Sequence, residues 1–259
     1  MISLLTPMEL LSLIVIFFVT SIISIVTGST SLITIPVMLQ FGIEPRSAVA
    51  TNMLALTLMS VGGSFSFRGR NLIDRRRMPL LIVLTLASSM LGALLLLIIP
   101  SRAMPVIISI LMVAVAFFSV VRRDAGGSLL GCEKSHVSEA AGYAVTFVLG
   151  IYGGFFSGGY VTILTAAFVA LFGMTFLQAV STTKMVNVFS SLVATLIFMW
   201  RGLVDYRLGI LLGIVMFTGG LIGGRVTLKL SNLWLSRIFL TVVVALALKI
   251  LLYDLFHHN

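Results

Sequence analysis

Uninterrupted apolar runs dominate this sequence and leave few folds open to it. Four of them, at 10–26, 78–99, 104–121 and 235–252, carry few or no charged residues. A helix of about 20 mainly apolar residues crosses a hydrocarbon core of about 30 Å, and these runs approach or reach that length. Composition agrees, since 59% of the residues are hydrophobic and only 10% are charged, whereas charged residues make up about 25% of a soluble domain. The sequence therefore predicts an integral, polytopic helical membrane protein.

The net charge of +9 does not point to nucleic acid, because basic residues gather at span ends. Five arginines lie in one short loop, at positions 68, 70, 75, 76 and 77. This is the pattern of a positive-inside loop, which we assign to the cytoplasmic side of a bacterial inner (plasma) membrane. We expect the lipid bilayer, and no nucleic acid, as a partner; a homo-oligomer is left open.

Cysteine and histidine usage predicts neither a disulfide framework nor a metal site. Cys132 is the single cysteine, and the three histidines form no His-Glu-x-x-His motif. No cofactor is expected. The first apolar run lacks a basic n-region and a small-residue cleavage site, so we interpret it as a retained helix.

Residues 41–92 reappear without a gap at 172–223, at an offset of 131. Fourteen of these 52 positions are identical. The identities include Phe41-Gly42, Ala48-Val49, Thr51 and the pattern Arg-x-Leu-x-Asp-x-Arg that starts at Arg70. A duplicated membrane unit is typical of secondary transporters, in which the substrate binds where the two halves meet.

A polar segment at 122–139 separates a first transmembrane repeat, 1–121, from a second, 140–259. Each half opens with a broken apolar stretch: 9–26 then 31–41, and 140–156 then 161–172. Three further spans follow in each half, at 46–67, 78–98 and 103–121, and at 177–199, 207–228 and 234–253. We expect an all-α polytopic membrane protein with two homologous repeats of about four spans each, whose broken first helices meet near the membrane midplane.

The number of crossings depends on the broken stretch. If it crosses once, each half has four crossings, the repeats are parallel and the chain has eight spans. If it forms a re-entrant hairpin or two crossings, each half has an odd number and the repeats are inverted. The basic residues do not decide between these arrangements, and we slightly favour eight spans.

The two breaks are candidate ligand-facing segments. They contain Gly28, Ser29 and Thr30 in the first half, and Ser157, Gly158, Gly159 and Tyr160 in the second, with Gly28 and Gly159 131 residues apart. Backbone groups released from a helix are costly in lipid unless they line a cavity or meet a ligand, and helix N-termini favour anions. The alternative is that these small residues only let helices pack closely.

The acidic residues argue against cation transport. All eight lie at span ends or in loops, and none sits centrally in a span. Cation-coupled carriers usually keep a carboxylate there, because it can bind the ion. The same absence, with no nucleophile–base pair on facing spans, argues against an intramembrane enzyme.

Lys184 is the exception on the basic side, since it lies one or two turns inside the span 177–199. Burying an ammonium in a membrane costs a few kcal/mol or more unless it is paired or hydrated. Lys184 is therefore predicted to hold an anionic substrate or to exchange a proton. The alternative is that it snorkels to the interface along its aliphatic stem. Its counterpart in the first half is Met53.

Polar residues around Lys184 favour an oxyanion as the ligand. The candidates are Thr51, Asn52, Thr182, Thr183 and Asn187. Their hydroxyl and amide groups can replace the water that an oxyanion gives up on binding. The alternative is hydrogen bonding between helices. In contrast, the Asp74 and Asp205 turns of the repeated Arg-x-Leu-x-Asp-x-Arg pattern are predicted to cap helices and to fix loops.

Several of these motifs together resemble the TauE/SafE family of sulfite-exporter-like permeases. The match runs through Ile35-Pro36-Val37, through 42–51, which reads Gly-Ile-Glu-Pro-Arg-Ser-Ala-Val-Ala-Thr, through the glycine-rich 153–159, and through 179–184. The first break departs from the family pattern, because it reads Thr27-Gly28-Ser29-Thr30 in place of a glycine triplet. Hydroxyls here would take over contacts that backbone amides make in other members.

The resemblance implies transport of sulfite, sulfonates or related small organosulfur anions, often outward. We therefore predict a secondary transporter that works by alternating access and binds a small anion, and co-transport of a proton is left open. The alternatives are a passive anion channel and, with less support, a non-transporting membrane scaffold.

Overall fold

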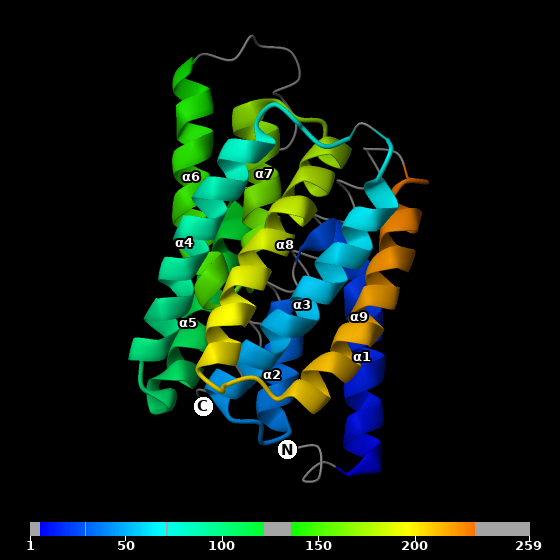
Figure 1. Ribbon diagram of the computed structural model, residues 1–259, viewed down its shortest axis with the longest axis vertical. Coiled ribbons are helices and arrows are strands. Elements are labelled where there is room, and N and C mark those ends of the chain that lie inside the picture. Colours follow the sequence, from blue (N-terminus) through cyan, green and yellow to red (C-terminus); the bar gives the residue numbers. More distant parts are fainter. Residues whose placement is uncertain (1–5, 29, 71, 122–135, 231–259) are drawn as a thin grey trace.

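We describe the protein from a computed structural model, of which residues 6–28, 30–70, 72–121 and 136–230 are described. All regular structure in these ranges is helical (Figure 1). The helices in chain order are α1 (Pro7–Thr27), α2 (Ser31–Gln40), α3 (Pro45–Phe67), α4 (Met78–Ile98), the short 3-10 helix η2 (Ser101–Ala103), α5 (Met104–Val121), α6 (His136–Phe155), α7 (Tyr160–Phe172), α8 (Phe176–Trp200) and α9 (Tyr206–Thr227). The expected span 234–253 and Cys132 lie outside the described residues.

Five of the described helices, α1, α3, α4, α8 and α9, are long and apolar enough to cross a membrane. The prediction of an all-α polytopic membrane protein is therefore confirmed. α6 begins at His136, a few residues before the span expected at 140–156.

Side chains cap several of the helices that begin at the ends of the bundle. α4 is an exception, because the Asp74 carboxylate accepts from the Arg76 and Arg77 N–H groups ahead of the helix, so the predicted capping of α4 by Asp74 was wrong. Thr6 and Glu9 form a capping box on α1, as Thr175 and Gln178 do on α8. The Asp205 carboxylate accepts from the Leu208 N–H at 3.0 Å, which confirms its predicted capping role on α9. These caps satisfy backbone N–H groups that have no partner within the helix.

The broken stretches are hairpins. α1 rises from the lower end in Figure 1, and α2 turns back toward that end, where α3 begins. α6 enters from the upper end, and α7 turns back to it. The preference for a single crossing was wrong, because α1 is already long enough to span by itself and its left-handed Gly28 reverses the chain. The two halves accordingly run in opposite directions.

The halves interleave instead of standing side by side. α9 of the second half packs on α1 and α3 of the first, and α4 of the first packs on α6 and α8 of the second. Helices that pair across the halves bury apolar side chains on both partners, so neither half forms a separate core.

Two hydrogen bonds repeat at the offset of 131 and link the halves reciprocally. The Thr51 hydroxyl accepts from the Asp205 N–H at 3.0 Å, and the Thr182 hydroxyl accepts from the Asp74 N–H at 3.4 Å. Each bond joins a span of one half to a turn of the other. The interleaved frame therefore has an approximate two-fold relation between its halves.

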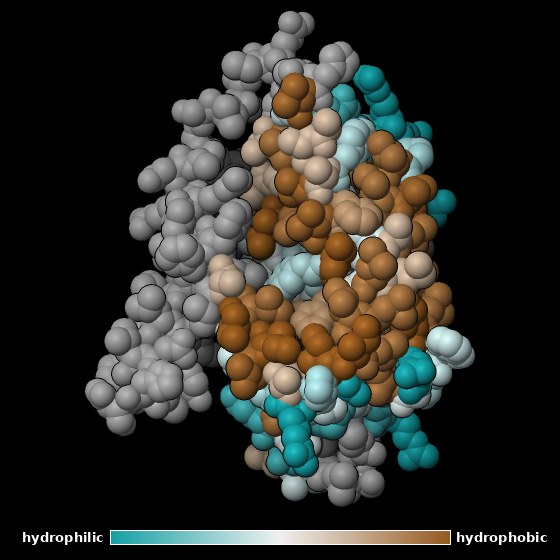
Figure 2. All heavy atoms as spheres, turned by 90° about the vertical axis from the view of Figure 1, so that its left-hand side faces the viewer, coloured by the Kyte–Doolittle hydropathy of each residue, from teal (hydrophilic) through white to brown (hydrophobic). Residues whose placement is uncertain are grey.

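Apolar side chains cover the middle of the outer surface. The face shown in Figure 2 has a broad hydrophobic zone, with hydrophilic residues concentrated toward its upper and lower ends. On α1, Leu11, Val15, Val19 and Ile23 recur every four residues and are all exposed. A stripe of this spacing lies on one helix face, as expected of a helix that faces lipid.

Candidate substrate site

The two helix breaks contact each other inside the bundle. Gly28 ends α1 with φ of 71°, and Gly159 precedes α7 with φ of 75°. A Cβ on Gly28 would lie 2.6 Å from the backbone nitrogen of Thr162, and the Thr162 hydroxyl donates to the Thr27 carbonyl at 2.5 Å. Only glycine combines the left-handed backbone with such a close approach. The two breaks therefore contact each other, and their place near the membrane midplane stays a prediction.

The second break is held by its neighbours in an uncommon conformation. Ser157 is buried and has φ of 63°, although it is not a glycine. Tyr152 donates a hydrogen bond to the Gly158 carbonyl, and Gly158 faces Leu32 of α2. A left-handed non-glycine residue costs about 1 kcal/mol or more, so the surrounding contacts are what maintain this turn.

Lys184 is buried in the bundle and does not snorkel. Its side chain is 1% exposed, and its Nζ donates to the Ser24 carbonyl at 2.8 Å. Ser24 lies in the last turn of α1, where the helix dipole favours a cation. None of the described carboxylates pairs with Lys184. A buried amine without a carboxylate partner among the described residues therefore lies beside the last turn of α1, which leads into the first break.

Asn52 and Thr183 tie each short helix to the span that follows it. Asn52 accepts from the Thr34 hydroxyl at 2.7 Å and donates to the Ser31 hydroxyl at 3.0 Å, which joins α3 to α2. The hydroxyls of Thr183 and Thr165 are 3.0 Å apart and join α8 to α7. Thr165 lies 131 residues after Thr34, so these two ties are equivalent. Both hold the breaks in position.

A group of buried polar atoms between α4, α7 and α8 lacks hydrogen-bond partners. The Tyr160 hydroxyl lies near the Thr85 and Ser190 hydroxyls without a well-aligned hydrogen bond, and the Asn187 Oδ1 has no partner, whereas the Asn187 Nδ2 donates to the Ser60 hydroxyl at 2.7 Å. Leaving a buried polar group unsatisfied costs about 1–3 kcal/mol. A ligand or water that satisfies these groups would recover that energy, so they are suited to binding.

The two helices that begin at the breaks have no side-chain cap. No side chain caps α2 at Thr30, and none caps α7 at Gly159. The Tyr160 N–H at the start of α7 donates to the Ser157 carbonyl at 3.3 Å. Both helix starts are buried, and the positive ends of their helix dipoles favour an anion.

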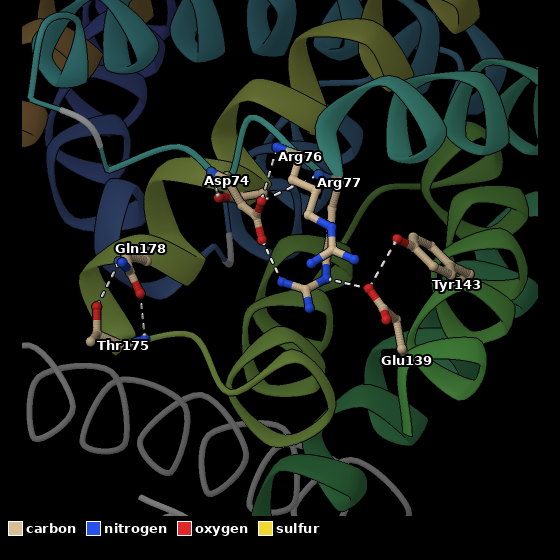
Figure 3. Close-up of polar contacts among 8 residues, drawn as sticks. Asp74, Arg76, Arg77, Glu139, Tyr143, Thr175 and Gln178 are labelled. Carbon is tan, nitrogen blue, oxygen red and sulfur yellow. Dashed lines mark hydrogen bonds and ion pairs between the residues drawn. The ribbon is translucent and has the colours of Figure 1, made fainter. Parts of the chain in front are cut away.

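A network of polar contacts around Arg77 lies at one end of the molecule (Figure 3). Its guanidinium pairs with Asp74 at 2.6 Å and with Glu139 of α6 at 2.8 Å, and it lies 5.0 Å from the centre of the Phe172 ring. The hydrogen bond from Arg77 lowers the pKa of the Glu139 carboxyl. This network joins the α3–α4 turn of the first half to α6 and α7 of the second.

The family model for the sulfite exporter TauE/SafE matches residues 13–250 of the chain. The chain belongs to the TauE/SafE family. Because this match covers nearly all of the chain, both broken stretches and the Lys184 span lie within it.

Curated relatives of this TauE/SafE protein are named as transporters. A probable membrane transporter protein, ORF9, from Sinorhizobium sp is 28% identical over 90% of this chain and 89% of its own. The probable membrane transporter protein YfcA of Escherichia coli is 27% identical over 93% and 89%. One from Haemophilus influenzae is 27% identical over 82% and 81%. No solved structure matches significantly. The chain is thus an integral membrane transporter, and its bacterial relatives agree with a bacterial inner membrane.

The structure separates the predicted site residues of this TauE/SafE member into three groups. Lys184, Asn187, Tyr160 and the two breaks gather in the interior. Asn52 and Thr183 lie next to the breaks but are engaged in helix ties. Thr51 and Thr182 bond to turns at opposite ends and do not face the breaks. Ser29 lies outside the described residues. Nothing in these contacts tests substrate binding itself, so the site remains a prediction.

Sequence reasoning missed Ser60, Thr85 and the hydroxyl pair of Ser89 and Ser190, which are 2.7 Å apart. A usable signal was present, because Thr85, Ser88 and Ser89 are spaced along one face of an otherwise apolar span. Across the described ranges, no three His, Cys, Asp or Glu residues are placed to hold a metal ion.

Proposed function

We propose that this transporter carries a small oxyanion, with sulfite or an organic sulfonate as the leading substrate class, and that the anion binds beside Lys184 where the two breaks meet. The observation that carries the proposal is the buried ammonium of Lys184, which has no carboxylate partner in the described part of the chain. A buried charge without a counter-ion is costly, and a substrate anion would provide one.

The remaining groups match an oxyanion better than a cation. The hydroxyls of Tyr160 and Thr85 and the uncapped N-termini of α2 and α7 are donors. All five described acidic residues lie at helix starts or in loops, so none of them can neutralise a cation in the interior. Oxyanions exchange hydration for hydrogen bonds with donors of this kind.

The Asn187 Oδ1 is a hydrogen-bond acceptor without a partner. A bound water could satisfy it, and so could a substrate that carries an O–H or N–H group. Hydrogen sulfite has one O–H group together with charged oxygens, so it offers a partner to Asn187 and also to Lys184. A proton would then cross with the substrate, without an acidic side chain to carry it.

Alternating access fits the inverted, interleaved halves. The Arg77 network fastens the halves to each other at one end. Opening that end requires Arg77 to separate from Glu139, while the buried breaks keep the binding groups in place. The family resemblance favours export as the direction of net transport.

The test is transport by purified protein in liposomes. We expect saturable flux of sulfite, and trans-stimulation when unlabelled substrate is present on the opposite side. Thiosulfate, taurine and acetate serve as competitors that rank the substrate classes. Flux that neither saturates nor shows counterflow would identify a passive anion channel, and binding without flux would favour a scaffold.

A further inference from the structure

A second feature of the molecule lies away from the breaks, where α3 and α9 end. A cavity of about 570 Å³ opens there between the two helices. Three arginines, Arg68, Arg70 and Arg225, line it together with apolar side chains that include Phe65, Phe217 and Leu221. None of the residues around Lys184 lines this cavity, so it is separate from the proposed substrate site.

The three arginines have no acidic partner among the described residues. Asp74 and Glu139 are the described carboxylates at this end, and both pair with Arg77. The side chains of Arg68, Arg70 and Arg225 are all exposed. A concentration of unpaired guanidinium groups favours a phosphate, since Arg binds phosphate through paired N–H donors.

The rest of the cavity wall is apolar and continues onto the lipid-facing surface. Phe65 is 51% exposed, and on α9 the neighbouring Ile222 and Val226 are also exposed. A free anion would gain nothing from these side chains. A ligand with a charged head and a hydrocarbon tail satisfies both parts of the wall.

The cavity lies at the more basic end of the molecule. Seven described basic residues lie at this end, and four lie at the opposite end. The seven are Arg68, Arg70, Arg75, Arg76, Arg77, Arg225 and Lys229, and the four are Arg46, Arg102, Arg201 and Arg207. The positive-inside rule assigns the richer end to the cytoplasm, and anionic lipid head groups bind basic pockets between helices on that side.

We propose that this cavity binds an anionic phospholipid of the cytoplasmic leaflet. The three guanidinium groups hold the head-group phosphate, and an acyl chain lies along Phe65, Phe217 and Leu221. A lipid bound there contacts both α3 of the first half and α9 of the second, and it stabilises their interface.

The test compares lipids on the purified protein in neutral detergent. Adding dioleoylphosphatidylglycerol is expected to raise the thermal unfolding midpoint, whereas dioleoylphosphatidylcholine is not. Each of R68Q, R70Q and R225Q should weaken the apparent affinity for phosphatidylglycerol by roughly fivefold, since a basic side chain contributes about 1 kcal/mol near an anionic surface.

The repeat provides a matched control, because Arg201 is the counterpart of Arg70 at the other end of the molecule. R201Q should leave the phosphatidylglycerol response unchanged. An equal loss in R70Q and R201Q would overturn the proposal, because it would indicate a diffuse charge effect. A similar shift with inorganic phosphate at equal ionic strength would also overturn it, since the tail would then contribute nothing. K184M should keep the lipid response, so this test is independent of the substrate site.

Discussion

The interior of α8 is polar at positions where the interior of α3 is apolar. The two helices occupy equivalent places in the interleaved frame, and residues 131 apart are buried in both, at most 3% exposed. The same contrast separates α4 from α9. The pairs, with the polar residue first, are Lys184 and Met53, Asn187 and Leu56, Ser190 and Met59, and Thr85 and Met216.

This contrast distinguishes what the fold needs from what the site needs. Apolar residues fill the equivalent positions on α3 and α9, although Met59 and Met216 are larger than Ser190 and Thr85. The helical arrangement at these positions therefore does not depend on polar groups. Buried polar groups are costly, and those on the α8 side are only partly satisfied. Their presence on one side is therefore best explained by a ligand that approaches α8, α4 and α7 from the interior.

The largest effect is expected from Lys184→Met, which copies the α3 side onto α8. Sulfite flux in liposomes should fall to background, a loss of at least about 100-fold, because the counter-ion for the anion is gone. The thermal midpoint should stay the same or rise, since an unpaired buried charge is replaced by an apolar side chain.

Met53→Leu is the control for Lys184→Met, because it alters the equivalent position without changing its polarity. It should retain most of the flux. If Lys184→Met kept more than half of the wild-type flux, Lys184 would have no part in binding. The contrast between the sides would then reflect packing alone.

Gly28→Ala is expected to have the next largest effect, because it disturbs the contact that holds the two breaks together. A Cβ at this position meets the Thr162 backbone at 2.6 Å and also requires a left-handed residue other than glycine. We expect a loss of about 3 kcal/mol or more in unfolding free energy, of which the backbone conformation alone accounts for about 1 kcal/mol.

Gly42→Ala measures the cost of the left-handed backbone conformation alone. Gly42 also has a left-handed φ, of 75°, but no heavy atom lies within 4 Å of its added Cβ. Gly42→Ala should lower the free energy of unfolding by only about 1 kcal/mol. Chemical denaturation in detergent measures both variants, and equal losses would show that the breaks are not tightly packed.

Asn187→Leu reproduces Leu56 of the α3 side and removes the unpartnered acceptor. We expect KM for sulfite to rise about tenfold, as one hydrogen bond to a charged ligand contributes about 1.5–3 kcal/mol. The Ser60 hydroxyl also loses its partner, so Asn187→Leu should be compared with the double variant that adds Ser60→Ala. A KM that stays at the wild-type value in both would remove Asn187 from the site.

The sequence predicted the membrane-spanning helices well, because hydropathy alone governs where a chain can cross lipid. Helix bounds at 31–41, 46–67 and 78–98 were close to those observed, and buried Lys184 was recognised as an anomaly. The direction of α2 was misjudged, since a ten-residue helix after a glycine is compatible with either a continued crossing or a reversal. Only the packing of Gly28 on Thr162 decides between them.

Long-range pairings were beyond sequence reasoning. Arg77 and Glu139 lie 62 positions apart, on either side of a loop, and nothing in their local pattern relates them. Thr51 and Thr182 had been grouped with the site because they neighbour Asn52 and Thr183. On a helix, adjacent residues point about 100° apart, so these threonines face the turns of the opposite half instead.

The smallest effect is expected from removing the Arg77–Glu139 ion pair, which is another point where the two halves differ. The Arg77–Glu139 pair has no counterpart, since the positions 131 away hold Leu208 and Met8. In Glu139→Gln the thermal midpoint at pH 7 should fall by about one to three degrees, as expected for a partly exposed ion pair.

The ion pair also makes stability depend on pH, because the folded pKa of Glu139 lies below its unfolded value of about 4.3. The pair therefore stabilises the protein fully above the unfolded pKa, and its contribution is lost as the pH falls through the folded pKa. The midpoints of wild type and variant should therefore differ by a constant amount from pH 8 to 5 and converge as the pH falls through the folded pKa of Glu139. Glu9→Gln is the control and should show no such convergence, because its new amide can still complete the capping box on α1. If the wild type still had a higher thermal midpoint than Glu139→Gln at pH 3, Glu139 would stabilise this end through packing instead of charge.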